Sequence, residues 1–259
     1  MSLGEKIIEN ALANGATIAG IASMEAVKKS ASHTIYSEMG DYTGVGTVRE
    51  RSSIKDFKLF NWPDAVKSLL VIGLSHPKDK PELDWWDGRG TPGNRILIDI
   101  IKRTRENIEN DMKIKTFSLH YYVEKGGIFL KDAAVLAGLG CIGKNNLLIT
   151  PLNGPEVRLR ALFLSADIQP TGPIDFDPCT ECKVPCRSIC PENAMNEKYS
   201  IFQSMKTSQP LPGRDGTYNR NLCNNRMEKD ERESSDQKDS KQPMVKYCRK
   251  CEFVCPVGR

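Results

Sequence analysis

Nine cysteines are the residues of this sequence most able to carry chemistry, and eight of them lie in its last third. Two of the cysteine groups, CTECKVPCRSICP and CRKCEFVCP, end in a Cys-Pro pair. The ninth, Cys141, stands apart. In a compartment that keeps thiols reduced, clustered cysteines are typical of metal ligands rather than of disulfides. The eight clustered thiols therefore predict metal centres in the C-terminal part of the chain.

The spacing of the first group differs by one inserted residue from the bacterial ferredoxin pattern C-x2-C-x2-C-x3-C-P. In that pattern three thiolates bind one [4Fe–4S] cluster and the fourth crosses to a second cluster. The same exchange predicts a first ligand set of Cys179, Cys182, Cys186 and Cys255. The second set is then Cys190, Cys223, Cys248 and Cys251. Zinc is the alternative, because C-x2-C pairs also suit a tetrahedral zinc ion; the Cys-Pro ends and the count of eight favour two iron–sulfur clusters.

The amino-acid composition limits the class of protein to which this chain can belong. The 259 residues are 39% hydrophobic and 27% charged, which is typical of a globular chain with one large domain or two modest ones. No apolar run reaches the roughly 18 residues of a membrane helix, and Glu5 and Glu9 lie where a signal peptide would be apolar. We therefore expect a cytoplasmic protein without a membrane partner. The net charge of +4 is scattered along the chain, so we do not expect a nucleic-acid partner.

Hydrophobic periodicity predicts mixed secondary structure up to about residue 170. Helices are expected at 3–14, 92–112 and 128–138, and strands at 17–23, 68–75, 116–123, 145–150 and 157–167. Residues 28–62 are expected to form long loops, 190–206 a short helix, and 226–242 a solvated charged loop. The sequence thus predicts an α+β protein with a cofactor-binding domain at 1–169 and a cluster domain at 170–259.

Three glycines, Gly138, Gly140 and Gly143, have the G-x-G-x-x-G spacing of a dinucleotide site. That site requires a strand before the glycines and a helix after them. Here the predicted order is the reverse, so we expect a glycine cap at a helix end rather than a nucleotide site.

The stretch AGLGCIGKNNLLITP, followed by two cluster motifs, resembles the epoxyqueuosine reductases, whose typical stretch reads AGLGWIGKN, and more distantly the reductive dehalogenases. The segments YNRNLC and YCRKCEFVCPVGR also fit that family. The resemblance implies a nitroreductase-like mixed α/β domain that binds base-off cobalamin, followed by a ferredoxin-like domain with two [4Fe–4S] clusters. It also implies that one loop lies near the corrin ring, formed by Gly140, Cys141, Ile142, Gly143, Lys144 and Asn145. We do not expect His33, His76 or His120 to bind cobalt, because none lies in a D-x-H-x-x-G motif.

The same resemblance assigns a proton donor. The family's VDSAPVLE matches VEKGGIFL here, which places Glu124 at the acid position. Tyr122 and Tyr121 are rival donors, since dehalogenases use a tyrosine; the alternatives are an exposed glutamate and two packing tyrosines. Cys141 replaces the family's tryptophan and is either cofactor-facing or a small buried thiol. The sequence stops without the helical repeats that hold tRNA in the family, so a tRNA substrate is not expected.

These observations predict an iron–sulfur oxidoreductase. Single electrons would pass from a low-potential donor such as ferredoxin or flavodoxin, through the clusters, to cobalamin and a small organic substrate. Two other classes remain open: an electron-transfer protein or reductive activator of a corrinoid protein with no substrate of its own, and a scaffold whose clusters are structural.

Overall fold

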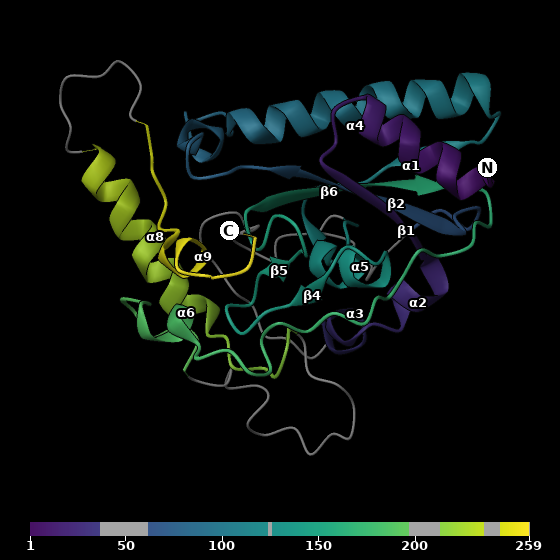
Figure 1. The fold of residues 1–259 in the computed structure, drawn as a ribbon. Coiled ribbons are helices and arrows are strands. Elements are labelled where there is room, and N and C mark those ends of the chain that lie inside the picture. Colours follow the sequence, from purple (N-terminus) through teal and green to yellow (C-terminus); the bar gives the residue numbers. More distant parts are fainter. Residues whose placement is uncertain (37–61, 124–125, 197–212, 236–243, 259) are drawn as a thin grey trace.

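The centre of the protein is a four-stranded antiparallel sheet with helices on both faces (Figure 1). The computed structural model describes residues 1–36, 62–123, 126–196, 213–235 and 244–258. The strand order is β1 (Ile18–Ser23), β2 (Ser68–Ser75), β6 (Val157–Leu164) and β3 (Thr116–Ser118). The register places Ile21 beside Leu70 and Leu70 beside Leu162, so these three side chains lie on the same face of the sheet.

Strand β2 divides the hydrophobic core into two layers, because successive side chains of a strand point to opposite faces. Leu69 and Val71 pack in the layer with Phe163 and α5 (Leu130–Leu136), together with α2 (Met24–Lys28). Leu70 and Ile72 pack in the other layer, against α1 (Leu3–Ala13) and α4 (Pro92–Asp111). The sheet is therefore buried on both faces, which explains the uninterrupted apolar sequence of β2.

Two of the predicted helices are confirmed nearly to the residue. Helix α1 begins with a capping box, in which the Ser2 amide donates to the Glu5 carboxylate at 2.6 Å and the Glu5 amide donates to Ser2 Oγ at 3.3 Å. Helix α4 begins at Pro92, after the Thr91 hydroxyl accepts the Asn94 amide at 3.2 Å. Local capping chemistry fixes both starts.

Other predicted elements are shorter or different. The strand expected at 116–123 ends at Ser118, and only Leu148–Ile149 (β5) of 145–150 is a strand, paired with β4 (Cys141–Ile142). The loop prediction for 28–62 is wrong for α3 (Ala31–Ile35), while 37–61 lies outside the described residues. The helix expected at 190–206 is not present in its described part, 190–196; a short helix, α6 (Pro185–Ser188), precedes it instead.

The charged loop predicted at 226–242 is a helix in its described part. Helix α8 (Arg220–Ser235) carries ion pairs one and two turns apart, from Arg226 to Asp230 and, at 3.0 Å, from Arg226 to Glu233. A further side-chain hydrogen bond joins Asn224 to Glu228 at 2.6 Å. Pairs at this spacing stabilise a helix that has few apolar residues. The charges that indicated a solvated loop therefore support a helix.

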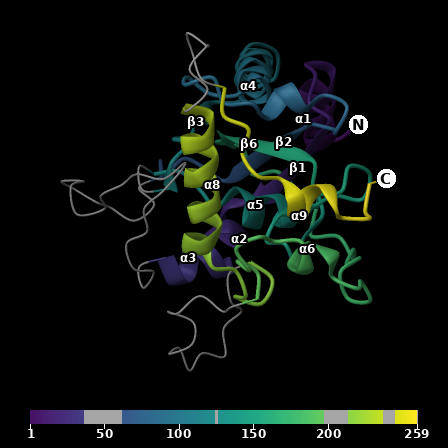
Figure 2. The same ribbon diagram turned by 90° about the vertical axis from the view of Figure 1, so that its left-hand side faces the viewer.

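The C-terminal helices α6, α8 and α9 (Lys250–Phe253) gather at one end of the sheet (Figures 1 and 2). Direct contacts join this region to the rest. The Thr171 hydroxyl donates to the Ala137 carbonyl at 2.7 Å, and Trp86 and Val245 exchange backbone hydrogen bonds at 2.8 and 2.9 Å. The C-terminal region is thus joined to the rest of the protein at two places.

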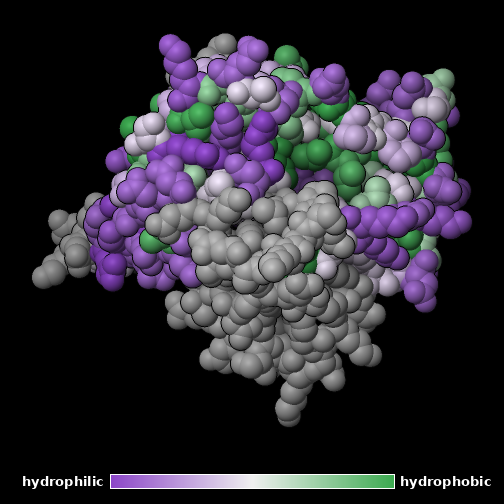
Figure 3. Space-filling model, turned by 90° about the horizontal axis from the view of Figure 1, so that it is seen from below, coloured by the Kyte–Doolittle hydropathy of each residue, from purple (hydrophilic) through white to green (hydrophobic). Residues whose placement is uncertain are grey.

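None of the helices in the described part of the chain combines the length and apolar character that crossing a bilayer requires. Seen from below, hydrophilic residues cover much of the described surface, and apolar residues show in smaller groups between them (Figure 3).

Candidate functional site

The first predicted ligand set comes together around one cavity. Cys179, Cys182, Cys186 and Cys255 all line it, although Cys255 comes from the distant end of the chain. The walls are otherwise formed mainly by apolar groups, including Ile149 and Val184. Three of these four cysteines are buried, and Cys182 is partly exposed. Burial, and then the neighbouring Cys179 and Cys255 thiols, raise the pKa of Cys186. A bound cation would relieve this crowding, because metals bind the deprotonated thiol.

Backbone geometry shapes this set. Val184 has a left-handed conformation (φ +58°) and its amide donates to Cys182 Sγ at 3.4 Å. The Cys179 amide donates to Asp177 at 3.0 Å, and Arg214 contacts the other oxygen of that carboxylate at 2.5 Å. The hydrogen bond from Arg214 lowers the pKa of Asp177 to about 2. An ionised pair therefore braces the first cysteine of the set.

The second predicted ligand set is also brought together. Its members are each partly exposed: Cys190, Cys223, Cys248 and Cys251. Burial raises the pKa of the Cys251 thiol, and Cys223, Cys248 and Cys190 raise it further. The Ala194 amide donates to Cys190 Sγ at 3.4 Å. These influences indicate that the four thiols lie near one another, and their role as ligands of one cluster stays a prediction.

The arrangement of the sulfurs bears on the choice between zinc and clusters. Across the described ranges, no three His, Cys, Asp or Glu side chains converge on a point that one metal ion would occupy. A tetrahedral zinc ion needs four ligands at about 2.3 Å from one centre. The first set surrounds a cavity and its donors are all thiols, so the residues present fit an iron–sulfur cluster.

The glycine loop lies between the sheet and both cysteine sets. Gly138 ends α5 with φ +73°, as the predicted cap requires, and the β4–β5 hairpin follows. A Cβ on Gly140 would lie 2.0 Å from the Ile149 carbonyl oxygen, and one on Gly143 would lie 2.6 Å from the Ile149 side chain. Contacts within the chain therefore account for these glycines, and a phosphate or corrin contact is not needed to explain them.

The polar residues of this loop face the cysteines. Lys144 and Asn145 line the first cavity, and Asn145 Nδ2 donates to the Cys251 carbonyl at 3.3 Å. Arg214 Nη1 donates a hydrogen bond to the Ile142 carbonyl oxygen at 3.4 Å. Cys141 is partly exposed, and burial followed by the nearby Cys179 raises its pKa to about 11. No local sequence signal predicts this bridging position, because it depends on segments that are distant along the chain.

The predicted proton donors are placed only in part. Glu124 lies outside the described residues. Tyr122 is partly buried and Tyr121 is 52% exposed, and their rings meet edge to face at 5.3 Å. Both follow the end of β3, so they are not the strand residues that the sequence predicted. Arg160 lies over the Tyr121 ring at 5.5 Å, which ties this tyrosine to β6.

The three histidines lie in different surroundings. His33 is buried, with Nδ1 2.7 Å from the Ser30 hydroxyl and Nε2 accepting the Phe129 amide at 3.2 Å. His76 Nδ1 lies 2.5 Å from Asp84 Oδ2, and His120 is exposed.

No family model matches the sequence. The epoxyqueuosine reductase of Lactococcus garvieae (strain Lg2) is 29% identical over 137 residues, which are 50% of this chain and 38% of that protein. The chain thus spans well under half the length of this curated relative.

Solved structures share the fold. The epoxyqueuosine reductase from Streptococcus thermophilus superposes with a TM-score of 0.60 at 20% identity, over 100% of this chain and 67% of that one. A catabolic reductive dehalogenase in complex with 3-bromo-4-hydroxybenzoic acid gives a TM-score of 0.58 at 16% identity, over 98% and 32%. The mixed α/β fold is therefore that of epoxyqueuosine reductase structures, and the predicted resemblance is confirmed: the chain is similar to epoxyqueuosine reductases in sequence and fold, and to a reductive dehalogenase in fold.

Proposed function

We propose that the protein is an iron–sulfur reductase in which two [4Fe–4S] clusters pass single electrons to cobalamin for the reduction of a small organic substrate. The observation that carries the proposal is the cavity shared by Cys179, Cys182, Cys186 and Cys255. A ferredoxin-type exchange requires the last cysteine of one group to join the first three of the other. Similarity to two kinds of reductase supports the same class of reaction.

The proposed architecture has two parts. Residues 1–169 would form a nitroreductase-like domain that binds cobalamin, and residues 170–259 a ferredoxin-like domain that binds the clusters. The hydrogen bond from Asn145 to the Cys251 carbonyl would connect the two parts, because it joins the glycine loop of one to a proposed cluster ligand of the other.

When bound, the clusters supply one-electron redox chemistry. The chain's own contribution is to hold the thiolates and set their surroundings. The amides of Val184 and Ala194 donate to cysteine sulfurs, and such bonds stabilise negative charge on a thiolate. The more exposed second set is the proposed point at which a ferredoxin or flavodoxin delivers electrons.

Cobalamin is proposed from the resemblance and the relatives, not from a protein ligand. The buried histidines His33 and His76 have protein partners, and neither is proposed as a cobalt ligand. A proton for the substrate would come from the Glu124 carboxyl, with the Tyr122 hydroxyl as the alternative donor. A carboxylic acid serves this role when burial raises its pKa.

The proposal is tested by adding cob(II)alamin to anaerobically reconstituted protein and recording the visible and EPR spectra. Reducible clusters together with a base-off cobalamin spectrum would support it. Reducible clusters without any spectral change would overturn the cobalamin part and favour an electron-transfer protein. Glu124→Gln should slow turnover and leave cobalamin affinity unchanged.

A further inference from the structure

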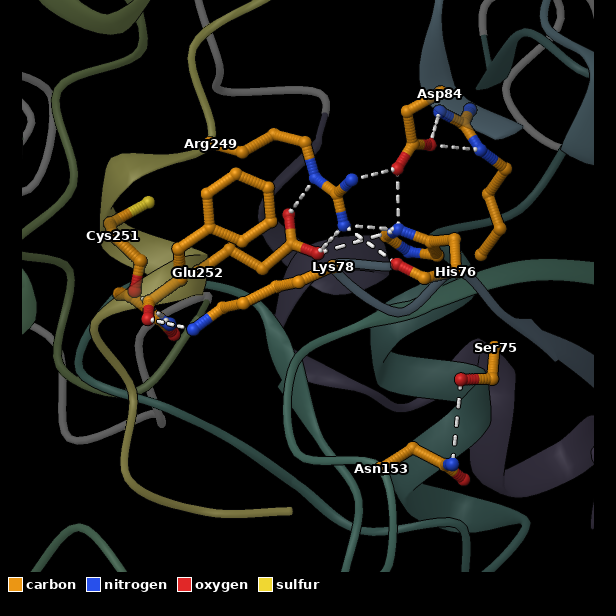
Figure 4. Close-up of polar contacts among 11 residues, drawn as sticks. Ser75, His76, Lys78, Asp84, Asn153, Arg249, Cys251 and Glu252 are labelled. Carbon is orange, nitrogen blue, oxygen red and sulfur yellow. Dashed lines mark hydrogen bonds and ion pairs between the residues drawn. The ribbon is translucent and has the colours of Figure 1, made fainter. Parts of the chain in front are cut away.

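A buried charged network joins the N-terminal sheet region to the second cysteine set (Figure 4). Its members come from the end of β2, the 3-10 helix Pro81–Asp84, strand β6 and the C-terminal cysteine turn. They are His76, Asp84, Arg158, Arg249 and Glu252. None of these residues was singled out by the cysteine or glycine motifs.

Arg249 is the centre of this network. It lies between Cys248 and Cys251 in the sequence, yet its guanidinium reaches away from the turn. Nη1 lies 2.6 Å from Asp84 Oδ2, Nε donates to Glu252 Oε2 at 2.9 Å, and Nη2 donates to the His76 carbonyl at 3.0 Å. Arg158 Nε donates to the other oxygen of Asp84 at 2.8 Å. One side chain therefore links the cysteine turn to two segments of the N-terminal part.

Four of the five side chains are almost completely withdrawn from solvent, and Arg158 is 30% exposed. The side-chain exposures are 12% for Arg249, 9% for Glu252, and 7% each for Asp84 and His76. Burial acts to raise the pKa of Asp84, but its hydrogen bond with His76 and the charges of Arg158 and Arg249 lower it to about 2. The carboxylate is therefore ionised. Buried ion pairs are weak sources of stability, because desolvation offsets their attraction, so this network needs another reason to be present.

We propose that Arg249 is a positioning residue for the second cluster: it fixes the Cys248–Cys251 turn on the N-terminal part and, balanced by Glu252 and Asp84, sets that cluster's reduction potential. This inference rests on the proposed function, since it requires a cluster in the second set. Lys78 supports the same attachment, because its Nζ donates to the Phe253 carbonyl at 2.6 Å.

The charge of each substituted residue determines the direction in which the cluster's reduction potential should change. Reduction adds one negative charge to a cluster, so a nearby cation favours the reduced form and a nearby anion opposes it. Arg249→Met leaves Glu252 and Asp84 without their shared cation and should lower the potential. Glu252→Gln leaves Arg249 in excess and should raise it. The double variant Arg249→Met/Glu252→Gln restores the balance and should return the potential toward that of the wild type.

The experiment is an anaerobic redox titration of the cluster-loaded protein, followed by EPR. We expect Arg249→Met to lower the reduced-to-oxidised ratio of one cluster about tenfold at a fixed potential, which is about 59 mV for a one-electron couple. Arg249→Lys keeps the charge and should stay within about threefold of the wild type. Arg214→Met is the matched control, because Arg214 pairs with Asp177 beside the first set and should move the other transition.

The outcomes separate this inference from the proposed function. The inference is supported if the two single variants shift the reduction potential in opposite directions and the double variant returns it toward the wild-type value. A second substitution would not repair lost packing. If Arg249→Met fails to retain iron, an upward shift in Glu252→Gln still supports the inference. Two results would overturn the inference. One is that neither single variant changes a cluster's reduction potential; the other is that Arg249→Met and Arg214→Met shift the same redox transition. Wild-type protein without any iron would instead overturn the proposed function.

Discussion

Asn145 and Cys251 connect the glycine loop to the second cysteine set through one hydrogen bond, from Asn145 Nδ2 to the Cys251 carbonyl oxygen at 3.3 Å. Asn145 is 3% exposed, and its Oδ1 accepts the Leu147 amide at 3.2 Å. The same side chain thus stabilises the loop and attaches it to the proposed cluster region.

Asn145→Ala should therefore destabilise the protein by about 1–3 kcal/mol, because two partly buried groups, the Leu147 amide and the Cys251 carbonyl, each lose a partner. Urea unfolding under anaerobic conditions measures this change. Asn153→Ala is the control, since its side chain makes a longer contact of 3.4 Å with Ser75. Equal effects of the two substitutions would show that the bridge is not a special contact.

The two ligand sets predict different effects for different cysteines. Cys182→Ser and Cys223→Ser should each remove about half of the iron, because each removes one ligand of one cluster. Cys141→Ser should retain the full amount, although Cys141 lies near Cys179. Iron and sulfide analysis of the purified variants tests this partition. Full iron in Cys182→Ser would show that the ligand assignment is wrong.

Gly140 should be intolerant of a side chain for steric reasons. Gly140→Ala places a Cβ 2.0 Å from the Ile149 carbonyl oxygen, whereas Gly90 has a similar φ (+147° against +153°) and a nearest atom 3.9 Å away. Both variants carry backbone strain of about 1 kcal/mol, but only Gly140→Ala adds the clash. Thermal unfolding should therefore show a clearly larger loss for Gly140→Ala. A loss no greater than that of Gly90→Ala would contradict the hairpin geometry.

His33 should make stability depend on pH. Burial lowers its pKa from an ordinary value of 6.5 to about 4, against the opposing charge of Asp132. Between these values the unfolded chain binds the proton and the folded protein does not, so stability is complete above pH 6.5 and falls as the pH drops toward 4. The expected loss is about 1.3 kcal/mol between pH 7.5 and 5.5.

The matched variant is His33→Gln, which can still accept the Phe129 amide but does not titrate. Denaturant unfolding at the two pH values should show a smaller pH dependence in this variant. An unchanged dependence would mean that another group is responsible.

Local signals in the sequence predicted the elements that end in clear caps. Thr91 and Pro92 fixed the start of α4, and Gly138 fixed the end of α5, because capping depends on neighbouring residues. Helix α8 was not predicted, because its charged residues were interpreted as a solvated loop. Their spacing of one helical turn, as in the pair Arg226 and Asp230, was not considered.

The candidate site also has a part that local sequence signals predicted and a part that they did not. Short cysteine spacings predicted which thiols gather, because ligand exchange between two motifs is encoded in those motifs. The bridge from Asn145 and the network around Arg249 could not be predicted. Both join residues far apart in the sequence, and Arg249 alone reads as one more surface charge in a C-x2-C turn.

The central claim is tested most directly by metal and sulfide analysis of protein purified without oxygen, together with its EPR spectrum after reduction. If the protein binds two [4Fe–4S] clusters, we expect about eight iron and eight sulfide ions per chain, a brown colour and EPR signals from two reduced clusters. A colourless protein, or one that contains zinc in place of iron, would contradict the proposed electron-transfer function.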